Sequence, residues 1–448
     1  MKFDYDLFVI GAGPGGLAAS ERAAGYGIRV AIAEQDLVGG TCVIRGCIPE
    51  KLMSFAAEFS EESQVAAGYG WKEVQECSFD WQQFIDAKDK EIHRLSQVHT
   101  QKLQKAGVEL INGYARFIDA HTLDIAGRQI TADKILIAVG AKDVKPEIPG
   151  SEYIITSSQL FSLKQQPKHI AIIGGNYIPV KLTGIMNNLG CQVTQIFQEE
   201  HILSSFDQDI AQAVQEGMAK RGIQILGNTK VKEIQRVGDE LDLMLSSETE
   251  KKLRVDTVLF ALCRTPNMDS LGLENAGIHL NEGGIMVDEY NQTTQANIFA
   301  VGDCINRINF TPVAIAQGRA FADTQFGNNP RKVCYEYVPS TVSSHPEAAT
   351  VGLSEAEARA KLGDDVRCYC SQFRPLLHSL TNRDEKTLIK LVVDNRSDRV
   401  LGAHMVGEGA IEIIHCLALA LRVGATKKHF DEAIGIHPSI AEEFLTLR

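Results

Sequence analysis

Residues 6–16 read DLFVIGAGPGG, an apolar β-prone run followed at once by a glycine-rich turn. The next residues, Leu17–Ala24, favour a helix, and Ile28–Ala33 is a second apolar run that closes on Glu34. A G-x-G-x-x-G turn between a strand and a helix, with an acid ending the next strand, is typical of a βαβ dinucleotide-binding unit. The sequence therefore predicts a nucleotide site here; the alternative is a glycine turn that binds no ligand.

Each residue type of this turn has a physical reason to be there. Gly11 permits the tight turn, Gly13 has no Cβ to block a pyrophosphate, and Gly16 lets the helix pack closely on the strand. The free N–H groups and the dipole of the helix N-terminus favour phosphate. Glu34 is placed to accept a hydrogen bond from a ribose hydroxyl.

The same plan recurs about 160 residues later. His169–Ile173 is an apolar run, residues 174–179 read GGNYIP, a helix is expected to about Leu189, and Cys191–Phe197 is a second apolar run. Two βαβ units imply two nucleotide-binding domains of related design. Residues 51–110 favour helix, with an amphipathic stretch at 82–106, and strands alternate with helices after about Tyr335.

Length and composition limit the classes of protein that fit. A chain of 448 residues is too long for one core. Its net charge of −12 argues against nucleic acid or an anionic membrane as a partner. The longest apolar stretch, Ala410–Ala425, contains Glu412, His415 and Arg422 and is expected to be a core helix. The chain enters a strand directly after Met1, so we expect no signal peptide, a cytoplasmic location and mostly free thiols.

Two cysteines follow the first unit, in the run GGTCVIRGCIP at residues 39–49. Cys42 and Cys47 are separated by four residues, after a Gly-Gly-Thr turn and before a proline, and can close a small, strained and therefore reactive disulfide. Because the pair lies downstream of a nucleotide turn, it is expected to exchange electrons with a bound cofactor. The alternatives are two buried structural cysteines or half of a metal site.

Residues 4–50, 169–185, 298–319 and 436–448 together resemble the class I pyridine nucleotide–disulfide oxidoreductases, in particular the glutathione reductases of cyanobacterial type. The resemblance covers essentially the whole chain. It implies an α/β protein with two Rossmann-like domains and a C-terminal α+β interface domain that forms a homodimer. The expected limits are 1–142 with 265–334 for the FAD domain, 143–264 for the NAD(P)-binding-like domain and 335–448 for the interface domain.

The resemblance also assigns roles to residues. Cys47 matches the thiol that lies against the flavin, and Cys42 the thiol that exchanges with the substrate disulfide. His437, a histidine able to carry a proton near neutral pH, matches the acid–base residue delivered by the partner subunit, and Glu442 matches its carboxylate. A lone histidine near a C-terminus is otherwise more often structural. The residues expected to bind the flavin are Gly11, Gly13, Pro14, Gly15, Gly16, Glu34, Gly40, Thr41, Lys51, Gly140, Tyr177, Asp303 and Thr311.

The second nucleotide turn departs from the family pattern. Asn176 stands where a small residue is expected; asparagine tolerates the left-handed backbone of a glycine, but its side chain takes space that a pyrophosphate needs. Pro179 removes an N–H from the first helical turn. The arginines expected to hold a 2′-phosphate are replaced by Gln198 and Ser204, with Glu199 nearby. NADPH binding should be impaired or lost, and NADH is also doubtful, unless this is only a drifted surface loop of an unimpaired enzyme.

Two charges appear exchanged relative to the family. The cysteine motif ends Pro49-Glu50-Lys51 where the family has Pro-Lys-Lys, and Lys181 stands where the family has the glutamate that pairs with the first lysine beside the flavin. One reversal would bury two like charges, whereas two reversals preserve the pair. We therefore expect Glu50 and Lys181 to form an ion pair, with an effect on the flavin potential whose direction the sequence does not give.

The disulfide-substrate site is mixed. Arg319 and Arg22 match or lie near glutathione-contacting positions, but Glu21 replaces a basic residue and His99 replaces a tyrosine. Glu21 should repel the carboxylates of glutathione disulfide, so a neutral or cationic disulfide is favoured.

Three functions fit these residues. The first is an FAD disulfide oxidoreductase of glutathione-reductase type acting on a small-molecule or peptide disulfide. The second is a flavin disulfide oxidoreductase or dithiol oxidase fed by a donor other than NAD(P)H. The third is a non-catalytic FAD-bound redox sensor.

Overall fold

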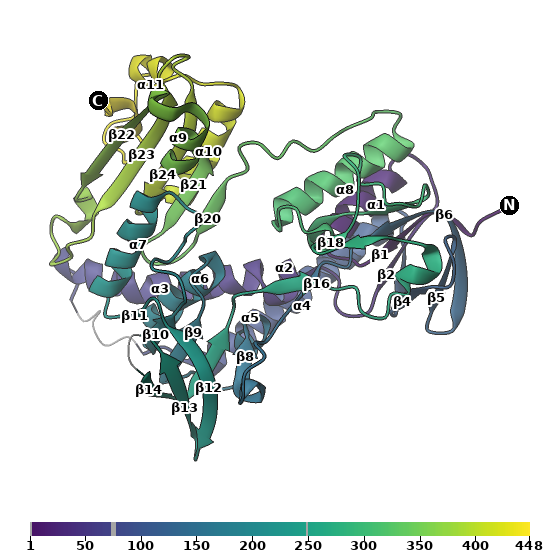
Figure 1. Cartoon of the computed structure of the whole chain (residues 1–448), viewed down its shortest axis with the longest axis horizontal. Helices are drawn as coiled ribbons and strands as arrows, with labels where there is room; N and C mark the ends of the chain where they lie inside the picture. Colours follow the sequence, from purple (N-terminus) through teal and green to yellow (C-terminus); the bar gives the residue numbers. More distant parts are fainter. Residues whose placement is uncertain (1, 73–77, 248–249) are drawn as a thin grey trace.

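The computed structural model describes residues 2–72, 78–247 and 250–448. The three largest sheets, of seven, five and five strands, lie in different parts of the chain (Figure 1). The sheet built from the N-terminal strands lies on the right of the figure, the second lies at the bottom, and the C-terminal sheet lies at the upper left. The result is the predicted α/β fold. The exact domain limits given above stay predictions.

The first sheet has seven strands in the order β3-β2-β1-β6-β5-β4, with β19 on the far side of β6. Strands β1, β2, β3, β6 and β19 are parallel, and most of their apolar residues are buried on both faces, as a sheet covered by helices requires, whereas those of the edge strand β3 are partly buried. The strands are β1 (Tyr5–Ile10), β2 (Val30–Glu34), β3 (Glu109–Asn112), β4 (Ala115–Phe117), β5 (Thr122–Ile125), β6 (Arg128–Ile137) and β19 (Ile298–Ala300).

Helices α1 and α8 pack closely against each other beside this sheet. Helix α1 (Pro14–Ala24) begins with proline at its first position, where a missing N–H costs nothing. A Cβ at Gly318 of α8 (Thr311–Phe326) would lie 2.3 Å from the Gly15 carbonyl oxygen, so glycine is needed at this contact. The close packing fixes the start of α1, and with it the first glycine turn.

The second sheet is parallel, in the order β11-β10-β9-β15-β8. Its strands are β8 (Ile154–Thr156), β9 (His169–Ile173), β10 (Gln192–Ile196), β11 (Gln224–Leu226) and β15 (Thr257–Phe260). It carries an antiparallel sheet of β12 (Lys230–Val237), β13 (Glu240–Ser246) and β14 (Glu250–Val255). A ribbon of β7 (Ala141–Asp143) and β16 (Arg264–Pro266) links it to the first sheet.

The C-terminal sheet is antiparallel, in the order β20-β21-β24-β23-β22. Its strands are β20 (Ser340–Val342), β21 (Ala348–Gly352), β22 (Val366–Phe373), β23 (Thr387–Asp394) and β24 (Val400–Val406). The remaining short strands are β17 (Leu280–Asn281) and β18 (Gly284–Ile285). The other helices are α2 (Gly40–Arg45), α3 (Cys47–Gly68), α4 (Trp81–Lys105), α5 (Ser157–Leu160), α6 (Tyr177–Asn188), α7 (Gln208–Lys220), α9 (Glu355–Leu362), α10 (Ala410–Arg422), α11 (Lys427–Glu432) and α12 (Glu443–Thr446).

Two expectations about helices need correction. The helical region predicted over 51–110 is two helices, α3 and α4, and residues 73–77 between them lie outside the described residues. The stretch 410–425 forms α10, but it is not a core helix. Its buried residues pack on β21 and β24, whereas Leu419 and Val423 on its other side are 70 % and 77 % exposed.

Candidate active site

The first glycine turn is lined by backbone because side chains do not fit there. Gly11 has a φ of +100°, and a Cβ at this position would lie 2.6 Å from the Ala138 carbonyl oxygen. A Cβ at Gly40 would lie 2.6 Å from the Gly13 Cα. The start of α2 therefore lies directly against the start of α1. Two helix N-termini meet at one place, which is a favourable environment for a pyrophosphate.

A single large cavity of about 1270 Å³ extends from this turn. All the residues predicted to bind the flavin line it except two: Gly16, which is packed on the Gly11 carbonyl oxygen, and Lys51. The Lys51 ammonium instead lies over the Phe55 ring on α3, 4.6 Å from the ring centroid. The lining residues from the prediction are Gly11, Gly13, Pro14, Gly15, Glu34, Gly40, Thr41, Gly140, Tyr177, Asp303 and Thr311, together with Cys42, Cys47, Glu50 and Lys181.

Two polar regions of the cavity suit a dinucleotide: one contains Glu34, and the other contains Asp303 and Asn309. Glu34 closes β2, and its Oε2 accepts a hydrogen bond of 2.8 Å from the Ala12 N–H, which fixes the carboxylate beside the turn. Burial raises the pKa of Asp303, although Arg264 acts in the opposite direction. The Oδ1 atom of Asn309, which also lines the cavity, is buried without a hydrogen-bond partner among the described residues. Such orphaned polar atoms are expected where a ligand supplies the partner.

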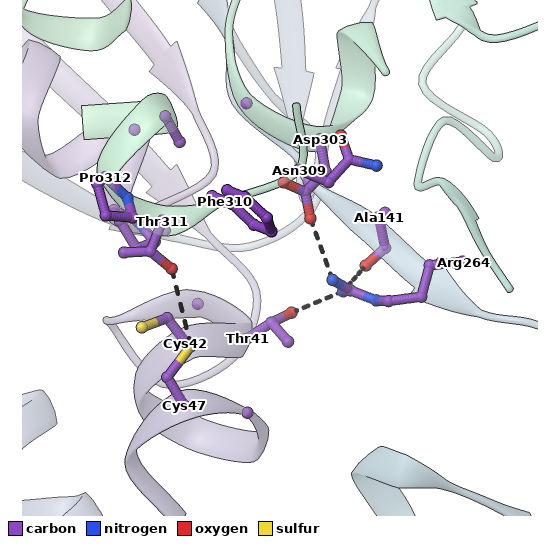
Figure 2. Close-up of a pocket in the computed structure, with 18 of the residues that line it drawn as sticks. Thr41, Cys42, Cys47, Ala141, Arg264, Asp303, Asn309, Phe310, Thr311 and Pro312 are labelled. Carbon is purple, nitrogen blue, oxygen red and sulfur yellow. Dashed lines mark hydrogen bonds and ion pairs between the residues drawn. The ribbon is translucent and has the colours of Figure 1, made fainter. Parts of the chain in front are cut away.

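Arg264 joins this polar region to the cysteine helix, a role that the sequence analysis missed (Figure 2). Its Nη1 lies 3.0 Å from Asp303 Oδ2, and its Nη2 donates to Thr41 Oγ1 at 3.3 Å and to the Ala141 carbonyl oxygen at 2.6 Å. The run Arg264-Thr265-Pro266-Asn267 was the signal that could have found it.

The two cysteines lie on consecutive helices, and the structure holds both as thiols. Cys42 is in α2, and Cys47 is the first residue of α3, 3.9 Å from Thr311 Oγ1. The hydrogen bond from Cys42 lowers the pKa of Cys47 to about 6, and the same bond raises the pKa of Cys42. A helix N-terminus also favours a thiolate at Cys47. In the reduced pair, a thiolate is therefore favoured at Cys47 and the proton at Cys42.

Glu50 and Lys181 meet beside this thiol, from α3 and α6. Lys181 Nζ lies 3.5 Å from Glu50 Oε1, and both side chains are largely buried, at 11 % and 17 % exposure. The ammonium also lies 5.5 Å from the centroid of the Tyr177 ring, close enough for a cation–π contact. Both charges act on the Cys47 pKa, which Glu50 raises and Lys181 lowers.

The second glycine turn differs from the expectation in one respect. Asn176 has a φ of −81° and is extended, as Gly13 is at the matching position of the first turn with a φ of −77°, so no left-handed backbone is required there. It is the N-cap of α6: its Oδ1 accepts from the Ile178 N–H at 3.2 Å, and its Nδ2 donates to the Leu262 carbonyl oxygen at 3.0 Å. Pro179, one residue further along, has no N–H. The Asn176 side chain thus accepts a hydrogen bond from a backbone N–H that a phosphate would otherwise bind.

The rest of this turn is also held by protein groups. The buried Gln195 donates to the Gly174 carbonyl oxygen at 2.9 Å, and the Leu203 N–H donates to the Gly175 carbonyl oxygen at 2.6 Å. Gln198, Glu199 and Ser204 are exposed on the loop after β10, and none of them lines the 1270 Å³ cavity.

His437 and Glu442 form a pair on the surface of the C-terminal domain. His437 Nδ1 lies 3.0 Å from Glu442 Oε1, and the histidine side chain is 82 % exposed. Hydrogen bonds from the Ser439 N–H and from His437 lower the pKa of Glu442. All residues from 431 to 438 are exposed, including Ile434 at 99 % and Ile436 at 82 %. The C-terminus lies well away from α2 in Figure 1, and His437 is not among the residues that line the cavity of Cys42 and Cys47.

The four predicted substrate residues lie on three helices outside the cavity. Arg22 on α1 donates through Nε to Asp323 Oδ1 at 2.6 Å, so part of its guanidinium is already engaged. Arg319 on α8 is exposed. Burial lowers the pKa of His99 on α4, against the effect of the nearby Glu21 carboxylate on α1. Glu21 and His99 are therefore close enough to interact electrostatically.

Two features were not found among the described residues. In the described part of the chain, no group of three or more His, Cys, Asp or Glu side chains is arranged to hold a metal ion. Of the helices in residues 2–72, 78–247 and 250–448, none is both long and apolar enough to cross a membrane.

Known proteins are similar to this chain in sequence and in fold. The profile of the pyridine nucleotide-disulphide oxidoreductase family matches residues 5–318, and the profile of the dimerisation domain of that family matches residues 338–448. Glutathione reductase of Nostoc sp. is 55 % identical, with 100 % of both chains covered, and glutathione reductase of Burkholderia cepacia is 45 % identical, with 100 % of this chain and 99 % of the relative covered. The HOCl-induced flavoprotein disulfide reductase RclA from Escherichia coli has a similar structure, with a TM-score of 0.89, 30 % identity and 99 % of both chains covered.

The chain therefore belongs to the pyridine nucleotide-disulphide oxidoreductase family. Within the family it is a flavoprotein disulfide oxidoreductase of the glutathione-reductase type. FAD is the cofactor expected for this family, and the glycine-lined cavity with its orphaned Asn309 oxygen suits it.

Proposed function

We propose that this enzyme exchanges electrons between FAD and a small disulfide or dithiol through Cys42 and Cys47, and that its use of NADPH is impaired. The observation that carries the proposal is the contrast between the cysteine site and the second dinucleotide turn. The cysteine site has two thiols with opposite pKa shifts beside a large cavity. The second dinucleotide turn has its helix start capped by Asn176, a residue of the turn itself.

The opposite pKa shifts give the two thiols different tasks. FAD, when bound, supplies or accepts the electron pair that interconverts the disulfide and dithiol forms of Cys42 and Cys47. Cys47 stays a thiolate near neutral pH without help. Cys42 has a raised pKa, so it needs a base before it can attack a substrate disulfide as a thiolate. An imidazole held by a carboxylate is suited to take that proton and to return it to the leaving thiol.

The base we assign is His437 of the partner subunit, in a homodimer. Support comes from the dimerisation domain and from the exposed segment 431–438, whose isoleucines are almost fully exposed in the single chain. Apolar side chains exposed to this degree on an ordered segment are expected to be covered by a partner.

The substrate disulfide is proposed to carry fewer carboxylates than glutathione disulfide, or a basic group. Glu21 adds a negative charge beside His99, whose pKa burial lowers. Arg22 is committed to Asp323. An anionic substrate would therefore be repelled by the Glu21 carboxylate, partly offset by the Lys102 ammonium that also acts on His99, whereas a neutral or cationic one would not be repelled.

Anaerobic titration of the flavin absorbance tests the proposal. We expect dithiothreitol to bleach the oxidised flavin readily, and stoichiometric NADPH or NADH to leave it largely unbleached. Reoxidation should then be faster with a neutral disulfide than with glutathione disulfide. Rapid bleaching by low NADPH would overturn the assignment of the second turn, and protein purified without flavin would overturn the function itself.

A matched variant identifies the cause. Gln198→Arg with Ser204→Arg restores two cations where a 2′-phosphate would bind, and each charge-assisted contact contributes about 1.5–3 kcal/mol. We expect tighter NADPH binding, with little change for NADH. If the arginines fail but Asn176→Gly restores reduction by both nucleotides, the altered turn is the dominant cause. The contrast between the cysteine site and the second dinucleotide turn also favours the alternative of a dithiol oxidase. Such an enzyme would consume oxygen steadily in the presence of dithiothreitol.

The thiolate of Cys47 gives a separate prediction with a pH dependence. Reduced protein should show a long-wavelength thiolate-to-flavin charge-transfer band, because Cys47 is expected to lie against the flavin. Since the pKa of Cys47 is lowered to about 6, the band should be present above that pH and lost as the pH falls through it. The absorbance of the band measured from pH 4.5 to pH 9 tests this, and we expect its midpoint within about one pH unit of 6. Cys47→Ser should remove the band and Cys42→Ser should keep it; a midpoint near 9 would contradict the assignment.

A further inference from the structure

The segment that follows β20 places a hydroxyl against the Glu50–Lys181 pair. Ser343 Oγ donates to Glu50 Oε1 at 2.6 Å, across 293 positions of sequence. Ser343 is 8 % exposed, and the contact is short for a hydrogen bond between a hydroxyl and a carboxylate. The same oxygen, Oε1, is the one that lies 3.5 Å from Lys181 Nζ. One carboxylate oxygen is therefore held from the C-terminal domain and from α6 at once.

The Ser343 contact is the tighter of the two. At 3.5 Å the ammonium is an ion-pair partner outside ordinary hydrogen-bond distance, so the orientation of the carboxylate depends on the hydroxyl. We propose that Ser343 is a positioning residue for Glu50: it fixes the carboxylate with Oε1 beside Lys181, and so sets the charge that the Cys47 thiol experiences. The inference rests on the proposed function only in that Cys47 is the thiol beside the flavin.

The direction of the effect follows from the signs of the charges. The Glu50 carboxylate opposes ionisation of Cys47, and Lys181 favours it. A hydroxyl donating to Oε1 spreads part of the carboxylate's charge and keeps the remainder paired with the ammonium. Without that hydroxyl the carboxylate acts more strongly on the thiol, so a Cys47 thiolate should form less readily.

The other ionisable groups near these side chains already have partners or act separately. Cys42 of α2 shares its proton with Cys47, and Tyr177 of α6 has a pKa raised by burial. On the segment of Ser343, His345 Nδ1 lies 3.0 Å from Glu61 Oε2. Burial raises the pKa of Glu347, whose carboxylate accepts from the Ile411 N–H at 3.3 Å.

The test measures the pKa of Cys47 by two independent readouts. Arg45 lies between the two cysteines, so trypsin separates them, and alkylation of Cys47 can be followed by mass spectrometry in reduced protein at a series of pH values. This readout does not need the flavin, so it remains valid if the proposed function fails. The charge-transfer band gives the same pKa when flavin is bound. For Ser343→Ala we expect an upward shift of about 0.5 unit or more.

Two controls separate positioning from a general loosening of the segment. Ser343→Thr keeps the hydroxyl and should restore the native value. Ser344→Ala removes the neighbouring hydroxyl, which is 2 % exposed and bonds the Val180 carbonyl oxygen at 3.1 Å, and should leave the Cys47 pKa unchanged.

A double variant decides whether the effect passes through Glu50. In a Glu50→Gln background, Ser343→Ala should produce no further shift, because the carboxylate it positions is gone. An unchanged pKa in Ser343→Ala, an equal shift in Ser344→Ala, or a full shift in the Glu50→Gln background would each overturn the proposal.

Discussion

Substituting His437 by glutamine is expected to slow disulfide turnover by about 10²–10⁴-fold while leaving the flavin spectrum and the dimer intact, which is the usual range for loss of a general acid–base group. The reason lies in the raised pKa of Cys42, which has no other base assigned to it. Glutamine preserves the size and polarity of the exposed side chain. Steady-state kinetics with a dithiol–disulfide pair measures the loss, and Glu442→Gln should give a smaller one.

Mixed dimers decide whether His437 acts across the subunit boundary. Cys42→Ser and His437→Gln subunits are each expected to have little or no activity in their own dimers. If the sites are built in trans, a dimer with one subunit of each kind has one intact site, because its native Cys42 and its native His437 lie on different subunits. Random mixing makes about half of the dimers of this kind, so roughly a quarter of the native activity should be recovered. A mixture that exchanges subunits yet recovers no activity would contradict the trans assignment.

Glu61→Gln is expected to lower the free energy of unfolding by about 3–5 kcal/mol, because it removes one carboxylate charge from a buried ion-pair network. Glu61 on α3 is 17 % exposed and meets Arg221 at 2.8 Å, His345 at 3.0 Å and Arg383, from the other two domains. Burial acts to raise its pKa, but the hydrogen bonds from His345 and Arg221 prevail and lower it. Guanidinium denaturation followed by fluorescence measures the change.

The pH dependence and a neighbouring residue provide the controls. Since the folded pKa of Glu61 is depressed, its contribution is complete above its ordinary value of 4.5 and is lost as the pH falls toward the folded value. The difference between native protein and variant should therefore narrow below about pH 4.5. Glu58→Gln, one turn earlier on α3 and 4.0 Å from Lys51 at the surface, should cost under about 1 kcal/mol. Equal losses of unfolding free energy in Glu61→Gln and Glu58→Gln would show that the buried network stabilises the fold no more than a surface ion pair does.

Much of the fold was predictable because local patterns decided it. The two glycine turns, each between an apolar strand and a helix, are found at the predicted positions, at the starts of α1 and α6. Strand pairing with the distant β19 and the antiparallel ribbon of β7 and β16 depends on chain segments far apart, which periodicity does not reveal.

The candidate site was predictable where a residue type carries its own chemistry. The structure brings Glu50 and Lys181 together, as the double charge reversal suggested. It also shows why Arg264 and Ser343 were missed. Arg264 meets Thr41 and Asp303 across the sequence, and an isolated serine such as Ser343 has no signal until folding places it against a carboxylate.

The cap that Asn176 provides has a consequence for how this protein can change over generations. A helix that satisfies its own first turn is stable whether or not a nucleotide is present. Further substitutions of exposed residues in the loop after β10 then remove no ligand contact on which the stability of the fold depends. Selection acting on stability alone would not preserve nucleotide contacts on that loop, whereas a change to one charge of the Glu50–Lys181 pair leaves the other charge without this buried partner.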